Sequence, residues 1–153
     1  MNLVRNEIAD VVALFERLPL SILQLGMRVG IAAMFFRSGL IKIRSWEFAV
    51  LLFRDEYQVP LLDPVTAARI ATAAELGLPV FLALGLGTRI AALPLLAMVT
   101  VIQVFVYPNA WSDHLIWASI LLLLLTRGPG KVSVDNLIAR HASIRNGDSS
   151  ASP

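Results

Sequence analysis

Long runs of apolar residues, separated by short polar stretches, dominate the chain and predict its helices. We expect four membrane-spanning helices at about 20–43, 64–86, 90–107 and 112–126. Asp63 can cap the second span, Pro64 suits its first helical position, and Gly85 and Gly87 mark its end. The fourth span would reach only ~22 Å, which is short for a hydrocarbon layer of ~30 Å.

Amphipathic stretches flank and interrupt these runs. The apolar spacing over 1–18 predicts a surface helix, and docking on the end of the bundle is an equal alternative. Aromatic residues over 45–57 predict an interfacial helix that covers one mouth of the bundle. Residues 128–144 predict a cytoplasmic amphipathic helix, and we expect 145–153 to be a disordered polar tail.

Composition agrees with an all-α integral membrane protein. Charged residues make up 16% of the chain and the mean hydropathy is +0.72, whereas soluble domains carry about 25% charged residues. The net charge of +2 is spread over segment ends, without a basic stripe for nucleic acid. There is no cysteine, which excludes thiolate metal sites and iron–sulfur clusters, so any redox electrons would travel on a cofactor or a partner.

Basic residues predict the orientation in the membrane. Four spans place both termini on one side, and that side would carry seven lysines and arginines against four on the other. The positive-inside rule therefore predicts that both termini are cytoplasmic.

Two charges lie deep inside predicted spans. Glu75 lies about 16 Å beyond Pro64, and Arg28 lies about 13 Å beyond Pro19 from the opposite face, at a rise of ~1.5 Å per residue. Since the midplane is ~15 Å from either face, we predict an intramembrane ion pair between Arg28 and Glu75. The pair either only locks the bundle or lines a polar pocket for a small anion or a quinone head group.

Three further polar residues are candidates. Lys42 either lines the outer mouth of the pocket or extends to the interface, as long basic side chains do near helix ends. His114, beside Trp117 at the start of the fourth span, is either an interfacial residue or a ligand or proton-transfer group. We expect Gln103 to form a helix–helix hydrogen bond rather than a ligand contact. The predicted substrate-binding set is therefore Arg28, Lys42, Glu75 and His114, and no metal motif is present.

Several short motifs occur in a familiar order. Arg28 precedes Phe35-x-x-x-Gly39-x-x-Lys42, and Glu75-x-Gly77 leads to Gly85-Leu86-Gly87-Thr88-Arg89. The chain then closes its fourth span with Gly128-Pro129-Gly130-x-x-Ser133-x-Asp135. Over roughly 24–138 this pattern resembles the DoxX family.

The resemblance implies a small four-helix protein of the bacterial inner membrane. Relatives are similar to subunits of thiosulfate:quinone oxidoreductase, and others are linked to membrane complexes that handle oxidative and sulfur stress. By resemblance, the positions of interest are Arg28, Lys42, Glu75, Arg89 and Asp135, and the motif residues are Gly39, Gly128, Gly130 and Ser133.

Two functions stay open at this point. One is a redox-associated subunit that binds a quinone or a small oxyanion and works with a soluble or membrane-bound redox partner. The other is a non-enzymatic anchor, scaffold or small-solute carrier. Both are compatible with a homo-oligomer in the lipid bilayer.

Overall fold

The computed structural model describes the backbone of residues 16–148 and the side chains of residues 16–142. The predicted surface helix at 1–18 lies almost entirely outside this part of the chain. The described residues form helices and no strand, which confirms the all-α prediction. The elements are α2 (Leu20–Arg44), α3 (Trp46–Leu52), the π-helix η1 (Phe53–Tyr57), α4 (Pro64–Leu84), α5 (Thr88–Val101), the π-helix η2 (Ile102–Val106), α6 (Trp111–Arg127) and α7 (Val134–Asp148).

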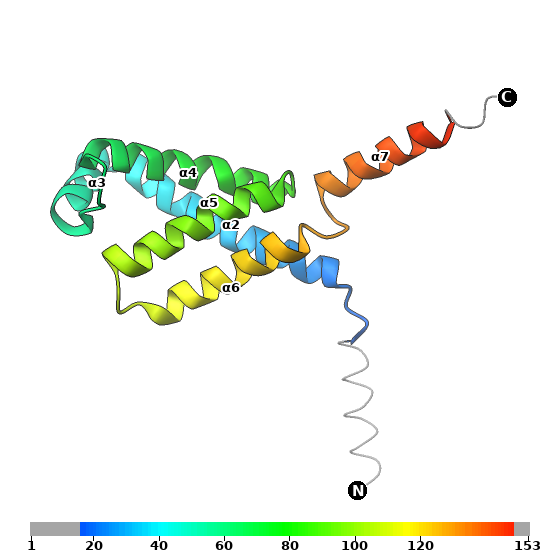
Figure 1. The fold of residues 1–153 in the computed structure, drawn as a ribbon, viewed down its shortest axis with the longest axis horizontal. Coiled ribbons are helices and arrows are strands. Elements are labelled where there is room, and N and C mark those ends of the chain that lie inside the picture. The colour runs from blue at the N-terminus through cyan, green and yellow to red at the C-terminus, as the bar shows by residue number, and fades with distance from the viewer. Residues whose placement is uncertain (1–15, 149–153) are drawn as a thin grey trace, which may run out of the picture.

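Helices α2, α4, α5 and α6 form an up-and-down bundle (Figure 1). Helix α2 packs along α4, α5 packs along α6, and the short turn between α4 and α5 joins the two pairs. The start of α2, the α4–α5 turn and the end of α6 lie at one end of the bundle, from which α7 projects (Figure 1). Helix α3 and η1 cover the other end, where the sequence predicted an interfacial helix (Figure 1).

Local signals explain where α4 begins and ends. The Asp63 carboxylate accepts hydrogen bonds from the backbone N–H groups of Val65 and Thr66, both at 3.1 Å, as predicted for a cap. The helix ends at Leu84, two residues before the predicted end, because Gly85 adopts a left-handed φ of +70°. The N–H of Leu86 then bonds to the carbonyl of Phe81, which turns the chain sharply into α5.

The exterior of the bundle is apolar. Among the described helices, α2, α4 and the continuous segment Thr88–Val106 are long and apolar enough to cross a membrane. Their outward faces expose large side chains such as Val29, Val80, Ile90 and Leu93. Because a water-soluble protein rarely exposes so much apolar surface, we conclude that this is a multi-pass membrane protein in contact with lipid. Helix α6 has 17 residues and a length of about 26 Å.

Two elements differ from the sequence prediction in their form. Helices α3 and α5 both widen into π-helices, η1 and η2, and these two segments contact each other. Such widened turns are frequent at functional sites. Helix α7 continues to Asp148, so the polar tail predicted from residue 145 is helical over its first residues.

Candidate functional site

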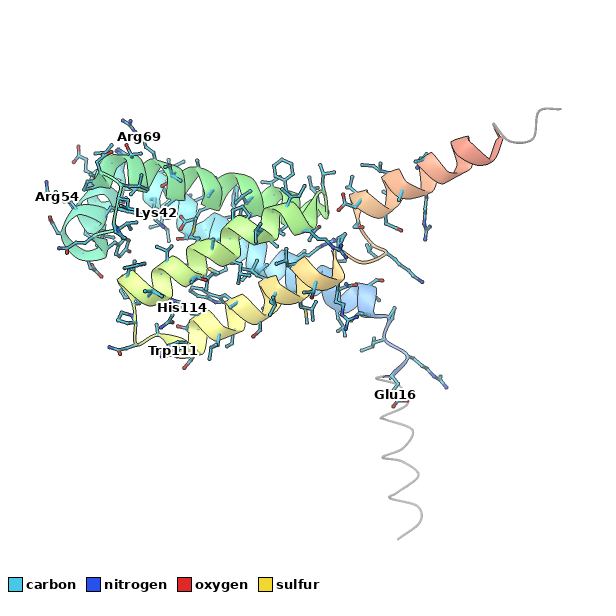
Figure 2. The ribbon with its side chains drawn as sticks, viewed as in Figure 1. Glu16, Lys42, Arg54, Arg69, Trp111 and His114 are labelled. Carbon is cyan, nitrogen blue, oxygen red and sulfur yellow. The ribbon has the colours of Figure 1, made fainter. Side chains whose placement is uncertain are left out.

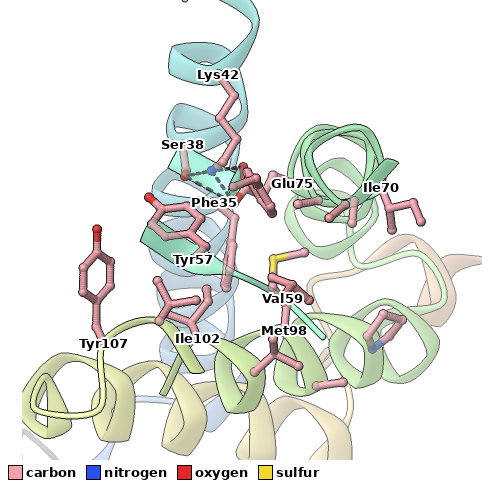
Figure 3. A pocket seen from close by; sticks show the side chains of 18 of the residues that line it. Phe35, Ser38, Lys42, Tyr57, Val59, Ile70, Glu75, Met98, Ile102 and Tyr107 are labelled. Carbon is pink, nitrogen blue, oxygen red and sulfur yellow. Dashed lines mark hydrogen bonds and ion pairs between the residues drawn. The ribbon is translucent and has the colours of Figure 1, made fainter. Parts of the chain in front are cut away.

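A cavity of about 430 Å³ lies inside the bundle, in the half nearer to α3 (Figure 3). Residues from α2, α4, α5, η2 and α6 surround it, and η1 contributes Phe53 and Tyr57. Its wall is mostly aliphatic and aromatic, with Phe35, Met98 and Trp117 among the lining residues. Small-molecule sites are typically concave, apolar and supplied with a few placed polar groups, and this cavity has that character.

The first polar group of the wall is the ion pair between Lys42 and Glu75. The Lys42 ammonium donates to both oxygens of Glu75, at 2.8 and 2.7 Å, and to the Ser38 hydroxyl at 3.0 Å (Figure 3). The Ser38 hydroxyl donates in turn to Glu75 at 3.3 Å. The two oxygens of one carboxylate are close enough to share a single N–H, so Glu75 and Ser38 engage at least two of the three N–H groups of Lys42. The alternative in which Lys42 extends to the interface is wrong, since only 16% of its side chain is exposed.

The close approach of α2 and α4 makes this pair possible. Gly39 lies on α2 between Ser38 and Lys42, and it faces Glu75 and Leu76 of α4. A Cβ atom at residue 39 would lie 2.8 Å from Cγ of Leu76, which is too close for a real contact. The absence of a side chain therefore lets α4 approach near enough for Glu75 to reach Lys42.

The second polar group of the wall is His114 on α6 (Figure 2). Only 4% of this residue is exposed, and its Nδ1 lies 2.6 Å from the side-chain oxygen of Gln103 in η2. The Gln103 amide nitrogen donates to the Pro108 carbonyl at 2.8 Å. The helix–helix hydrogen bond predicted for Gln103 is thus confirmed, and its partner is His114.

Arg28 corrects the predicted ion pair, because it does not contact Glu75. Its guanidinium donates to the carbonyls of Pro129 and Val132, both at 2.9 Å, and to that of Ala83 at 3.4 Å. Only 1% of Arg28 is exposed, and it is absent from the wall of the cavity. In this antiparallel pair of helices Gly39 faces Glu75, so Arg28, three turns earlier on α2, lies level with the end of α4.

The motif residues after α6 surround Arg28 and its neighbour Gln24. The Gln24 amide donates to the Gly128 carbonyl at 3.1 Å, and a Cβ at Gly130, whose φ is +83°, would collide with Gln24. The Ser133 hydroxyl accepts from the Asn136 N–H at 3.2 Å and so caps α7. This segment therefore wraps the first third of α2.

Two further motif residues tie the α4–α5 turn to the same region. The Asp135 carboxylate accepts from the N–H groups of Gly87 and Thr88, at 2.9 and 3.4 Å. The Arg89 side chain donates to the Thr126 carbonyl at the end of α6, at 3.2 Å. We call the set Gln24, Arg28, Asp135 and residues 128–133 the clamp, because its hydrogen bonds join the start of α2 and the α4–α5 turn to the segment after α6.

The structure thus brings Lys42, Glu75 and His114 to one cavity and places Arg28 in the clamp. The sequence analysis did not include Ser38, Tyr57 or Trp117 in the predicted binding set, although all three line the cavity. Ser38 had a usable signal, because it lies one turn before Lys42 on the same helix face. Among the described residues no three His, Asp or Glu side chains gather as metal ligands would.

By its fold and its site, this is a helical, multi-pass membrane protein with an ion pair in the wall of an apolar cavity. The DoxX family model matches residues 23–108, and the chain belongs to the DoxX family. A protein of Haemophilus influenzae, named only as uncharacterised, is 32% identical over 124 residues, which cover 74% of this chain and 82% of that protein. No solved structure matches the chain significantly.

Proposed function

We propose that this DoxX protein is a redox-associated membrane subunit whose cavity binds a quinone-type head group. The observation that carries the proposal is an aromatic and aliphatic cavity of about 430 Å³ with the Lys42–Glu75 pair and His114 in its wall. The volume falls in the range of about 300–1,000 Å³ typical of small-molecule sites. A quinone needs an apolar slot for its ring and polar groups for its two oxygens, and the wall offers both.

The charge balance of the wall favours a neutral ligand over a small oxyanion. An anion buried in an apolar site needs a cation or several free donors. Lys42 is neutralised by Glu75 and also donates to Ser38, and Arg28 lies outside the cavity wall. We therefore assign a quinone in preference to an oxyanion, with Lys42, Glu75 and His114 as the contacting residues.

The mouth of the cavity suits a ligand that arrives from the membrane. Tyr57 and Tyr107 lie there with their rings 5.9 Å apart, and the Tyr107 hydroxyl donates to the exposed Glu56 at 3.0 Å. Tyrosines are common at the membrane–water boundary, which is where the head group of a lipid-soluble quinone resides. Hydrogen bonding with Tyr57, partial burial and hydrogen bonding with Glu56 together raise the pKa of Tyr107 above its usual range, so its hydroxyl stays protonated at neutral pH.

The proposal includes the arrangement in the membrane. Helix α6 would be the fourth span, and its length of about 26 Å suits a site where the bilayer is locally thinned. The end of the bundle with α7 would face the bacterial cytoplasm, as the count of lysines and arginines predicts. Because the chain has no cysteine, a soluble or membrane-bound partner would exchange electrons with the quinone.

Extraction of the purified protein tests the proposal. We expect a quinone in the organic extract of protein purified in mild detergent, detected by mass spectrometry at near-stoichiometric amounts. Ala74→Phe should abolish it, because Ala74 lines the cavity and the larger ring would fill the space. Ala73→Phe is the matched control, since the neighbouring residue is exposed on the outside of the same helix. Equal quinone in both variants, or none in the unaltered protein, would contradict the proposal.

One observation favours the second candidate function, a scaffold. Helix α7 projects from the bundle, and Leu137 and Ile138 on it are each 55% exposed (Figure 1). A soluble partner that binds α7, with no quinone in the extract, would support the scaffold. A partner that binds α7 together with a bound quinone would support the redox subunit.

A further inference from the structure

Two buried polar groups lie in the wall of the cavity, the Lys42–Glu75 pair and His114, and their hydrogen bonds determine what each can offer a ligand. At the ion pair, the Lys42 ammonium donates to Glu75 and to Ser38. The Glu75 carboxylate has about four lone-pair sites, of which Lys42 and Ser38 occupy three. This side of the wall can therefore accept a hydrogen bond from a ligand through Glu75. Any N–H of Lys42 that Glu75 and Ser38 leave free can bond to the oxygen of a quinone as well as to that of a hydroquinone.

At His114 the hydrogen-bond chain determines which ring nitrogen carries the proton. The Pro108 carbonyl can only accept, so the side-chain nitrogen of Gln103 must point to it. The Gln103 oxygen then faces Nδ1 of His114, and an oxygen at 2.6 Å requires an N–H at that position. A neutral imidazole has one N–H, so Nε2 carries a lone pair. In the described part of the chain, the side-chain hydrogen bond of His114 is the one at Nδ1.

We infer that the cavity selects the reduced, hydroquinone form of its ligand over the oxidised quinone. The inference rests on the proposed function and adds the redox state of the ligand. A hydroquinone carries two O–H groups, one for Nε2 of His114 and one for the Glu75 carboxylate. A quinone carries two carbonyl oxygens, which can only accept and would face these lone pairs without a proton between them.

The other donors near the cavity do not oppose this selection. Tyr57 and Trp117 also line the wall, and each has an O–H or N–H group. Their donors can bond to the oxygen of a hydroquinone as well as to that of a quinone. Only the acceptors therefore discriminate, because only the reduced form has protons to donate.

Each hydrogen bond of this kind is worth about five-fold in affinity. We expect decyl-ubiquinol to bind at least about five-fold more tightly than decyl-ubiquinone, measured by anaerobic titration calorimetry on the full chain after removal of co-purified quinone. His114→Phe should weaken ubiquinol binding by about five-fold and leave ubiquinone binding unchanged. Gln103→Leu should have the same effect, because it frees the imidazole to place its proton on Nε2.

His141→Phe is the matched control, since this second histidine lies exposed on α7, outside the cavity wall. It should change the affinity for neither form. If His114→Phe fails to fold, the nitrogen chemical shifts of labelled His114 in the unaltered protein test the same point, and they should show a proton on Nδ1.

Equal affinity for the two forms, or a proton on Nε2, would overturn the inference and leave the quinone site standing. Binding of neither form would remove the proposed function, and this inference with it.

Discussion

Helix α2 carries two buried cations that differ in their partners. Arg28 and Lys42 lie 14 residues apart, or about 21 Å along the helix. Arg28 donates to backbone carbonyls of the loop after α6, while Lys42 binds a carboxylate in the wall of the cavity. Arg28 is fully buried, whereas 16% of the Lys42 side chain is exposed. The kind of partner and the open space beside it distinguish a structural cation from a candidate site.

The largest effect should come from removing the structural cation. Arg28→Met leaves the carbonyls of Pro129 and Val132 buried without a donor, and we expect a loss of about 3 kcal/mol in the free energy of unfolding. Thermal unfolding in detergent measures it. Arg28→Lys should restore only part of the loss, because an ammonium does not reproduce the planar fork of the guanidinium. Unchanged stability in Arg28→Met would refute the clamp.

Breaking the Lys42–Glu75 pair should cause a smaller loss of stability, and its removal should also abolish quinone binding. Glu75→Gln leaves Lys42 without its counter-ion, and we expect a loss of about 2 kcal/mol, since the lysine is partly exposed and can rehydrate. The double variant Lys42→Met, Glu75→Gln should recover most of that stability and still lose quinone. A double variant as unstable as the single one would show that the two residues are not coupled.

Alanine substitutions at two glycines of α2 should cause the smallest changes in stability. Gly39→Ala would force a Cβ against Leu76 and separate α2 from α4 beside the ion pair, which we expect to cost about 1–2 kcal/mol and to weaken ligand binding. At Gly26 a Cβ meets nothing within 4 Å, so Gly26→Ala should change stability by less than about 0.5 kcal/mol. Similar losses at both positions would show that the close approach to Leu76 is not the cause, since the higher helix propensity of alanine by itself favours the helix.

Much of the fold follows from patterns that act locally. The Asp63-Pro64 start of α4 and the glycines after it work through neighbouring residues, so the sequence alone predicts them. Hydrophobic runs predicted the four bundle helices within a few residues, because each run spans its own element. The π-helices were not predicted, since the widening of a turn leaves the period of apolar residues almost unchanged.

The partners of the buried charges could not be predicted from local sequence patterns. The depth estimate placed Arg28 and Glu75 at one level by assuming that Pro19 and Pro64 mark opposite faces of one membrane layer. Helix α2 has 25 residues and extends past the end of α4, so its first third is packed by the loop after α6 instead. Which residues face each other depends on the offset between two antiparallel helices, and Gly39 sets that offset by its contact with α4.

A single uninterrupted helix links the loop that holds α7 to the wall of the cavity. Any rotation of α2 about its axis would turn Lys42 relative to Glu75 and, in the same motion, loosen or tighten the grip of Arg28 on residues 129–132. A rotation of α2 that follows binding in the cavity would therefore reach the loop before α7 at the other end of the bundle.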